Sequence, residues 1–162
     1  MVDYIMDWRY IEFFEMEHFD DPLYPGSGEF IDPLLVFALD ALRRRTGWPI
    51  VPHVLNVIGE DGEPFTIGGA VDMYGEHDHA TNSYHLKKNG CKACDFHFLT
   101  EAPIRLQYRA VEKMGFTGLG IYIKKWKWGG KILPAGFHVD FRPKEKIQRW
   151  SDRKGRKRIY LL

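Results

Sequence analysis

The chain has 162 residues, 44% of them hydrophobic and 15% aromatic, which is enough for one domain with a well-filled core. The net charge of +1 excludes a strongly basic nucleic-acid binder, and two cysteines exclude a multi-disulfide framework. We find no membrane-spanning run and no secretory signal. We therefore expect a single domain over residues 1–162 that is made in the cytoplasm and has no membrane partner, with a basic C-terminal tail at 151–162.

The N-terminal half predicts a helix followed by a strand. Residues 1–17 are rich in aromatic and acidic side chains and predict a short helix. The clearest helix spans 31–45, where Asp32 is a good N-cap, a proline follows it, and Gly47 ends the helix. Residues 49–58 are apolar and β-branched and predict a strand.

The C-terminal half predicts three strands and one more helix. A polar, glycine-containing loop at 68–82 precedes a strand at 92–99, and a helix follows at 103–114. Further strands are expected at 118–126 and 136–142. Because helices and strands are mixed without a strict βαβ alternation, we expect the α+β class, with a small antiparallel sheet flanked by helices.

Two segments carry histidine and carboxylate side chains, which are the ligands of catalytic zinc sites. The first runs from Ser83-Tyr84-His85 to Asp95, and the second is the strand at 136–142. Residues two apart on a strand project to the same face, so His138 and Asp140 are expected to point together. A carboxylate beside a zinc-bound water is suited to act as a general base.

These motifs resemble the LAS-type zinc peptidases, the D-Ala-D-Ala carboxypeptidase and L-alanyl-D-glutamate endopeptidase group, which cuts peptidoglycan cross-link peptides. The family pattern is Ser-x-His, a glycine-containing loop, Ala-x-Asp, and a late strand carrying His. One branch ends in Phe-x-His-Val-Asp-x-Arg, to which Gly136-Phe137-His138-Val139-Asp140-Phe141-Arg142 is similar. Gly47-Trp48-Pro49-Ile50 and the segment 115–120 also fit, so the resemblance covers roughly residues 10–150.

The resemblance implies a hedgehog/D-Ala-D-Ala-peptidase-like fold and a zinc cofactor held by His85, Asp95 and His138. Asp140 is the candidate general base, with the alternative that it only orients a ligand. The residues expected to contact a peptidoglycan peptide substrate are Ser83, His53 and Arg142. The implied reaction is hydrolysis by a metal-activated water, as a carboxypeptidase or an endopeptidase. A phage-type enzyme released by other proteins fits the missing export signal.

Two departures from the family pattern keep other functions open. Nine residues separate His85 from Asp95, a longer spacing than the family pattern has, and the stretch 52–56 lacks the arginine that binds the substrate carboxylate, for which His53 is a candidate replacement. The first alternative is a non-catalytic binding or virion structural module on the same fold. The others are a structural zinc held by Cys91 and Cys94 with histidines, and nucleic-acid binding through the Lys/Trp-rich segment 124–131, for which a neutral protein gives no clear support.

Two further groups receive a structural interpretation. We expect Cys91 and Cys94 to be small buried thiols that flank the strand carrying Asp95. We expect Glu76-His77-Asp78-His79 to be a solvated loop at the rim of the cleft, with contact to the substrate, to a ligand or to the metal as alternatives.

Overall fold

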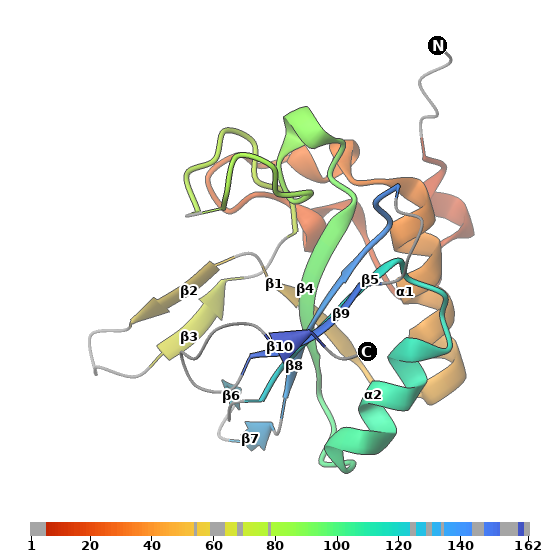
Figure 1. Ribbon diagram of the computed structural model, residues 1–162. Coiled ribbons are helices and arrows are strands. Elements are labelled where there is room, and N and C mark those ends of the chain that lie inside the picture. Colours follow the sequence, from red (N-terminus) through yellow and green to blue (C-terminus); the bar gives the residue numbers. More distant parts are fainter. Residues whose placement is uncertain are drawn as a thin grey trace.

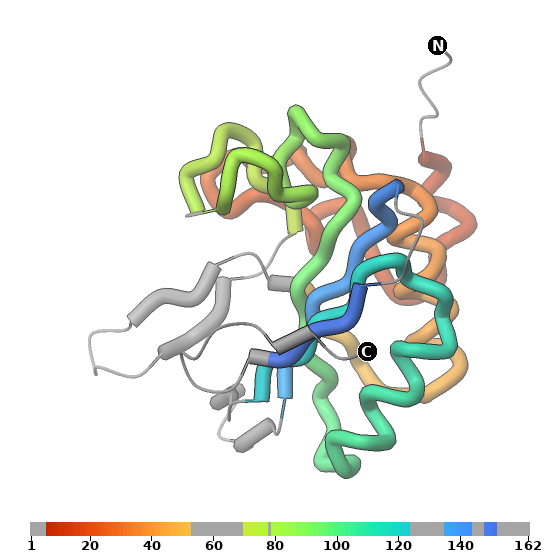
Figure 2. Tube along the Cα trace, in the orientation of Figure 1, coloured from red at the N-terminus to blue at the C-terminus, as the bar shows by residue number. Residues whose placement is uncertain are grey.

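The computed structural model describes residues 6–53, 55–58, 64–67, 70–77, 79–123, 126–128, 131–133, 135–143, 148–152 and 159–160 (Figures 1 and 2). The fold is α+β, as predicted. A six-stranded sheet has the order β1-β4-β8-β5-β9-β10, and two two-stranded sheets pair β2 with β3 and β6 with β7. The strands of the main sheet are β1 (Ile50–His53), β4 (Ala93–Phe98), β8 (Gly136–Asp140), β5 (Gly118–Tyr122), β9 (Gln148–Asp152) and β10 (Ile159–Tyr160). The short pairs are β2 (Leu55–Ile58) with β3 (Pro64–Ile67), and β6 (Trp126–Trp128) with β7 (Lys131–Leu133).

The main sheet is mixed, which corrects the expectation of a purely antiparallel sheet. Each neighbouring pair is antiparallel except β5 and β9, which run parallel. Strand β9 follows β8 in the chain after a short connection, but it lies on the far side of β5. Strands β5 and β9 both run opposite to β8, so they are parallel to each other.

Two helices lie on one side of the sheet (Figure 1). Helix α1 (Pro33–Thr46) begins where the Asp32 side chain accepts hydrogen bonds from the amides of Leu34 and Leu35, and it ends at Gly47, whose φ of 68° is left-handed. Helix α2 (Ile104–Glu112) packs beside α1. The helices predicted at 31–45 and 103–114 are confirmed, and so are the caps of α1, which local signals specify.

Side chains along β4 and β8 alternate between the hydrophobic core and the opposite, polar face of the sheet. Cys94, Phe96, Phe137 and Val139 are fully buried in the hydrophobic cluster that includes the apolar face of α1. The residues between them point to the opposite face, where Asp95 lies directly across from His138. The chemistry-bearing side chains therefore share one face because the core takes the other.

Glycine on β5 makes room for this polar face. Gly118 pairs with Asp140 and Gly120 pairs with His138 across the β5–β8 ladder. A Cβ atom at Gly118 would overlap the Asp140 carboxylate, and a Cβ atom at Gly120 would overlap the Trp150 ring. The Gly-Leu-Gly sequence thus leaves space for a carboxylate and an indole above the sheet.

Some expectations differ from the structure or lie outside the described residues. In place of a short helix at 1–17, the described part has 3₁₀ turns η1 (Trp8–Tyr10) and η2 (Met16–Phe19); two more are η3 (Ser27–Phe30) and η4 (Lys87–Asn89). The strand expected at 49–58 is divided into β1 and β2. Most of the basic tail, including 153–158, lies outside the described residues. Among described residues, none of the helices has the length and apolar character needed to cross a membrane.

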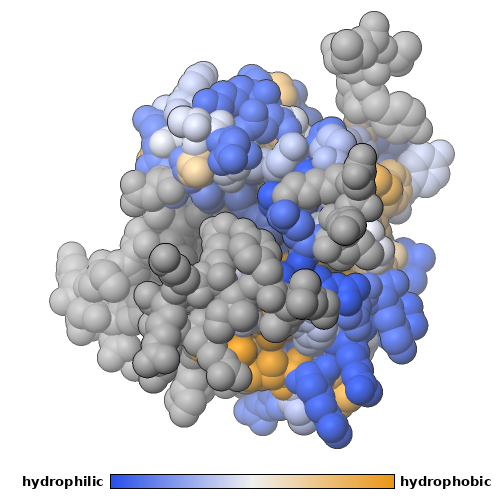
Figure 3. Space-filling model, viewed as in Figure 1, coloured by the Kyte–Doolittle hydropathy of each residue, from blue (hydrophilic) through white to orange (hydrophobic). Residues whose placement is uncertain are grey.

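The surface viewed in Figure 3 is mainly hydrophilic at the top, where Figure 1 shows the segment 70–91, and at the lower right beside α2. Apolar residues gather in one patch near the bottom of that view.

We expect Gly118→Ala to lower the free energy of unfolding by about 1–3 kcal/mol, because the added methyl group meets a buried carboxylate. In an Asp140→Ala background the same substitution should cost less than about 1 kcal/mol, since the overlapping group is gone. Urea unfolding of the four proteins of this double-mutant cycle measures the coupling. Additive effects would contradict the packing described for Gly118.

Candidate metal centre

The structure brings together the three side chains predicted to hold a metal. His138 Nδ1 lies 2.7 Å from Asp95 Oδ1, and His85 Nε2 lies 3.6 Å from the same oxygen. The two facing ring nitrogens of His85 and His138 are 3.4 Å apart. The register of β4 and β8 places Asp95 and His138, whereas His85 arrives from the loop before β4.

His85 is held so that one defined nitrogen faces the site. Its Nδ1 lies 3.1 Å from the carbonyl oxygen of Ala70, an acceptor only, so Nδ1 carries the proton and donates. Nε2 faces Asp95 and carries a lone pair whenever the ring is neutral. The loop itself is tied down by the Asp72 amide, which donates to the His85 carbonyl, and by the Ala70 amide, which donates to the Phe19 carbonyl.

His138 bridges two carboxylates. Its Nδ1 faces Asp95, and its Nε2 lies 2.9 Å from Asp140 Oδ2. Burial lowers the pKa of His138, but the two carboxylates outweigh burial and raise it to about 9. Burial likewise raises the pKa of Asp95, but His85 and His138 hold it well below its usual range. The side chain of His138 is only 11% exposed, so the cluster consists of buried charges that neutralise one another.

Asp140 is occupied on both oxygens. It accepts from His138 Nε2 and from the guanidinium of Arg142, whose Nε lies 2.7 Å from Oδ1. Burial raises the pKa of Asp140, but these partners lower it to about 2. Such a carboxylate is a weak proton acceptor. The geometry therefore favours the alternative role, in which Asp140 fixes the orientation of His138.

The residues predicted to bind substrate have separate positions. Ser83 Oγ accepts a hydrogen bond from the His85 amide, so Ser83 shapes the turn that presents His85. Arg142 is paired with Asp140, and its guanidinium carbon lies 5.0 Å from the centre of the Tyr84 ring. The backbone of His53 lies opposite Asp95 in the β1–β4 ladder, and the side chain of His53 lies outside what the structure describes.

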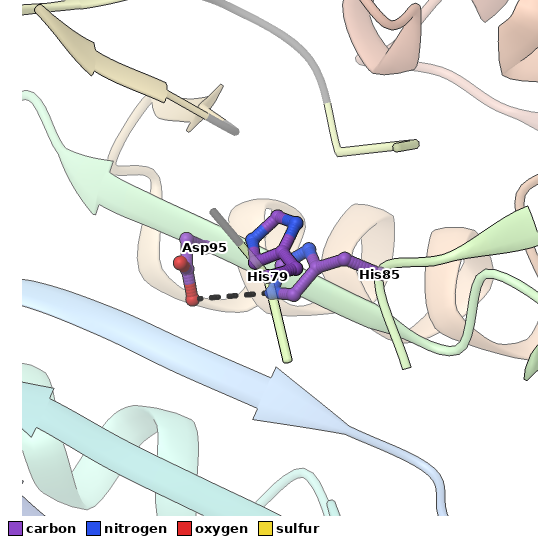
Figure 4. Close-up of side chains that lie close together, drawn as sticks. All are labelled: His79, His85 and Asp95. Carbon is purple, nitrogen blue, oxygen red and sulfur yellow. Dashed lines mark ion pairs between the residues drawn. The ribbon is translucent and has the colours of Figure 1, made fainter. Parts of the chain in front are cut away.

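His79 lies beside this cluster, a placement that the sequence analysis kept only as an alternative to a solvated loop. A ring nitrogen of His79, one of His85 and a carboxylate oxygen of Asp95 lie within 4.8 Å of one another. Figure 4 shows the three side chains close together. The rings of His79 and His85 are stacked, with centroids 4.4 Å apart and planes 2° apart. The expectation of a solvated loop is wrong for His77 and His79, because buried aspartates draw both rings inward.

A second group of possible ligands, Asp21, Asp72 and His77, is also buried. Its oxygens are already used. Asp21 accepts from His77 Nε2 and from the amides of Leu23 and Met73, and Asp72 accepts from His79 and from the amides of Gly75 and Glu76. This group therefore anchors the loop that carries His77 and His79.

Cys91 and Cys94 are free and fully buried, as expected. Burial raises the pKa of the Cys91 thiol to about 12 and that of Cys94 well above its usual value. Neither sulfur belongs to a group of three or more possible metal ligands among the described residues. Cys94 faces the core, on the side of β4 opposite to Asp95.

The spacing of the three donors can be compared with that of a tetrahedral metal site such as zinc. Bonds of 2.0–2.1 Å in a tetrahedron place ligand atoms about 3.4 Å apart, and the three separations here are 2.7, 3.4 and 3.6 Å. Each histidine also donates its far nitrogen to a fixed acceptor, the usual support of a metal-binding imidazole. The shortest separation is a hydrogen bond between His138 and Asp95, so a bound cation would take the place of its proton.

The fold and the cluster define a small α+β domain with buried His and Asp side chains positioned to bind a metal ion. Comparison of the chain with protein-family models, with curated proteins and with solved structures gives no match.

The raised pKa of His138 predicts a pH dependence of stability. A folded-state pKa of about 9, against 6.5 for a free histidine, stabilises the fold fully below pH 6.5 and loses that contribution as the pH rises through about 9. For protein stripped of metal by a chelator, we expect the free energy of unfolding to fall by on the order of 1–3 kcal/mol between about pH 6 and about pH 9. Urea unfolding of wild type and His138→Gln isolates this contribution, which the variant should lack. An equal pH dependence of the two proteins would contradict it.

Proposed function

We propose that this protein is a zinc-dependent peptidase that hydrolyses peptidoglycan cross-link peptides. The observation that carries the proposal is the convergence of His85 Nε2 and His138 Nδ1 on one oxygen of Asp95, with the far nitrogen of each ring held by an acceptor. These are the residues on which the resemblance to the LAS-type peptidases rests. Zinc, when bound, supplies a Lewis acid that polarises a peptide carbonyl and lowers the pKa of a water to roughly 7.

The chain's own groups prepare this site in defined ways. Ala70 O holds the proton of His85 on Nδ1, and Asp140 holds a proton of His138 on Nε2, so both near nitrogens face Asp95. Arg142 neutralises Asp140, which leaves Asp95 as the charge that faces the near nitrogens. Asp95 is 16% exposed at its side chain, so the cluster has an edge that a peptide can reach.

The arrangement also favours this proposal over a structural zinc held by cysteines. Cys94 is the direct neighbour of Asp95 in the chain, but it points into the core. A site that used its sulfur would have to draw ligands from the apolar face of the sheet, which Phe96 and Phe137 fill.

The neighbouring positions 94 and 95 provide a matched test. We expect the wild type to bind about one zinc per chain, Asp95→Asn to weaken zinc affinity by on the order of 100-fold or more, and Cys94→Ala to leave zinc affinity unchanged. Metal analysis of dialysed protein and competition with a chromophoric chelator measure these quantities. Zinc lost in Cys94→Ala and retained in Asp95→Asn would instead assign a structural site to the cysteines.

Hydrolysis is tested on the zinc-loaded full chain with purified cross-linked muropeptides. Chromatography and mass spectrometry are expected to show new amine and carboxyl ends, and the released fragment separates a carboxypeptidase from an endopeptidase. Asp95→Asn, which keeps the shape of the side chain, should give no product. Zinc binding in the wild type without any cleavage would overturn the enzymatic proposal and leave a binding module on the same fold.

A further inference from the structure

Two histidines in the loop before β4, His77 and His79, bear on how the proposed function is carried out. His79 and His77 are two residues apart, and each is held by a buried aspartate, yet only His79 lies against the metal centre. Its ring stacks on His85 at 4.4 Å, and its side chain is 16% exposed. His79 is thus anchored, adjacent to the candidate ligands and still accessible. These properties suit a role in the reaction other than holding the metal.

The stacking decides that His79 is not a fourth ligand of the ion that His85 would hold. The lone pair of an imidazole nitrogen lies in the plane of its ring, so a metal ion binds close to that plane. The planes of His79 and His85 are 2° from parallel and stacked one above the other. One ion cannot lie in two separate parallel planes. His79 would therefore stand beside a bound ion rather than ligate it, where a water or a substrate would have access.

Asp72 determines which nitrogen of His79 is available. His79 Nδ1 lies 2.8 Å from Asp72 Oδ2. Asp72 also accepts hydrogen bonds from the amides of Gly75 and Glu76, so its carboxylate acts as an acceptor in this loop. In the neutral His79 ring the proton therefore lies on Nδ1, and Nε2 presents a lone pair. Asp140, by contrast, has both oxygens engaged by His138 and Arg142.

We propose that His79 is the catalytic proton acceptor of the peptidase, that Asp72 is its positioning residue, and that the substrate is a peptide bond. The water that attacks the carbonyl carbon gives one proton to His79 Nε2 while its O–C bond forms. The C–N bond then breaks, and the same proton passes from Nε2 to the nitrogen of the leaving amine. This inference rests on the proposed peptidase function.

The decisive variant is His79→Asn. The asparagine amide nitrogen takes the place of Nδ1 and keeps the hydrogen bond to Asp72, but nothing takes the place of Nε2. We expect kcat on muropeptide to fall by about 100-fold or more with little change in KM, as removal of a general base does. Zinc affinity should stay within about threefold of wild type, because His79 is proposed neither to ligate the metal nor to hold a ligand. Loss of an outer residue that supports a ligand would instead lower the affinity by about 10–100-fold. The absorption spectrum of the Co²⁺-substituted protein, which reports the ligand set, should be unchanged.

His77→Gln is the matched control. His77 lies in the same loop, and its Nε2 is 2.9 Å from Asp21. The glutamine amide nitrogen takes the place of Nε2 and keeps the hydrogen bond to Asp21, so the loop stays anchored while the imidazole is removed. We expect its kcat to stay within about threefold of wild type when loaded with zinc. An equal loss of activity in His77→Gln and His79→Asn would show that the loop as a whole matters, and would overturn the proposal.

Two other results would overturn it. A changed Co²⁺ spectrum and a zinc affinity as low as that of Asp95→Asn would make His79 a ligand, whatever the activity. Full activity in His79→Asn would remove its catalytic role while the peptidase function stands. If the wild type binds zinc without cleaving muropeptide, the proposed function fails first and the role of His79 fails with it.

Discussion

The site depends on the register between β4 and β8. Asp95 lies opposite His138 and Cys94 lies opposite Val139, so the ladder sorts ionisable side chains to one face and apolar ones to the other. A slip of one residue would turn His138 into the apolar core and bring Val139 to the polar face, at a cost in lost burial and unpaired charge. The hydrophobic core therefore fixes the geometry of the candidate metal centre, although no core side chain takes part in it.

Charge balance follows from that constraint. Asp95 and Asp140 lie on either side of one imidazole, and Arg142 neutralises the outer carboxylate. Buried charges persist only when they are paired, and here the pairing is sequential, from Arg142 through Asp140 and His138 to Asp95. The proton on His138 Nδ1 is the member of this sequence that a cation replaces. Gly118 contributes to this arrangement, because the absence of a side chain leaves room for the Asp140 carboxylate.

The sequence predicted the parts of this arrangement that local signals specify. Helix α1 follows from Asp32 and Gly47, and the cluster of His85, Asp95 and His138 was implied by the resemblance of two short motifs to the LAS-type peptidases. The parallel pairing of β5 and β9 was missed because strand order depends on contacts distant in the sequence. His79 was ranked only as an alternative for a different reason: its partners Asp72 and His85 are close in the chain, but the stack on His85 exists only once the loop folds back. The partner of His77 lies 56 residues away. The signal available was two histidines in an acidic loop just before Ser-x-His.

What distinguishes a catalytic from a structural metal site is the fourth position, because structural zinc sites are closed by four protein ligands. Three donors converge here, and among the described residues Asp140 lies behind His138, Cys94 points across the sheet, and His79 is parallel to His85. The edge of the cluster at Asp95 and His79, whose side chains are each 16% exposed, is the part that a ligand can reach. Because Arg142 is tied to Asp140, a substrate carboxylate bound at this edge under the proposed function would have to be held by other groups, which would separate peptide recognition from the proposed chemistry.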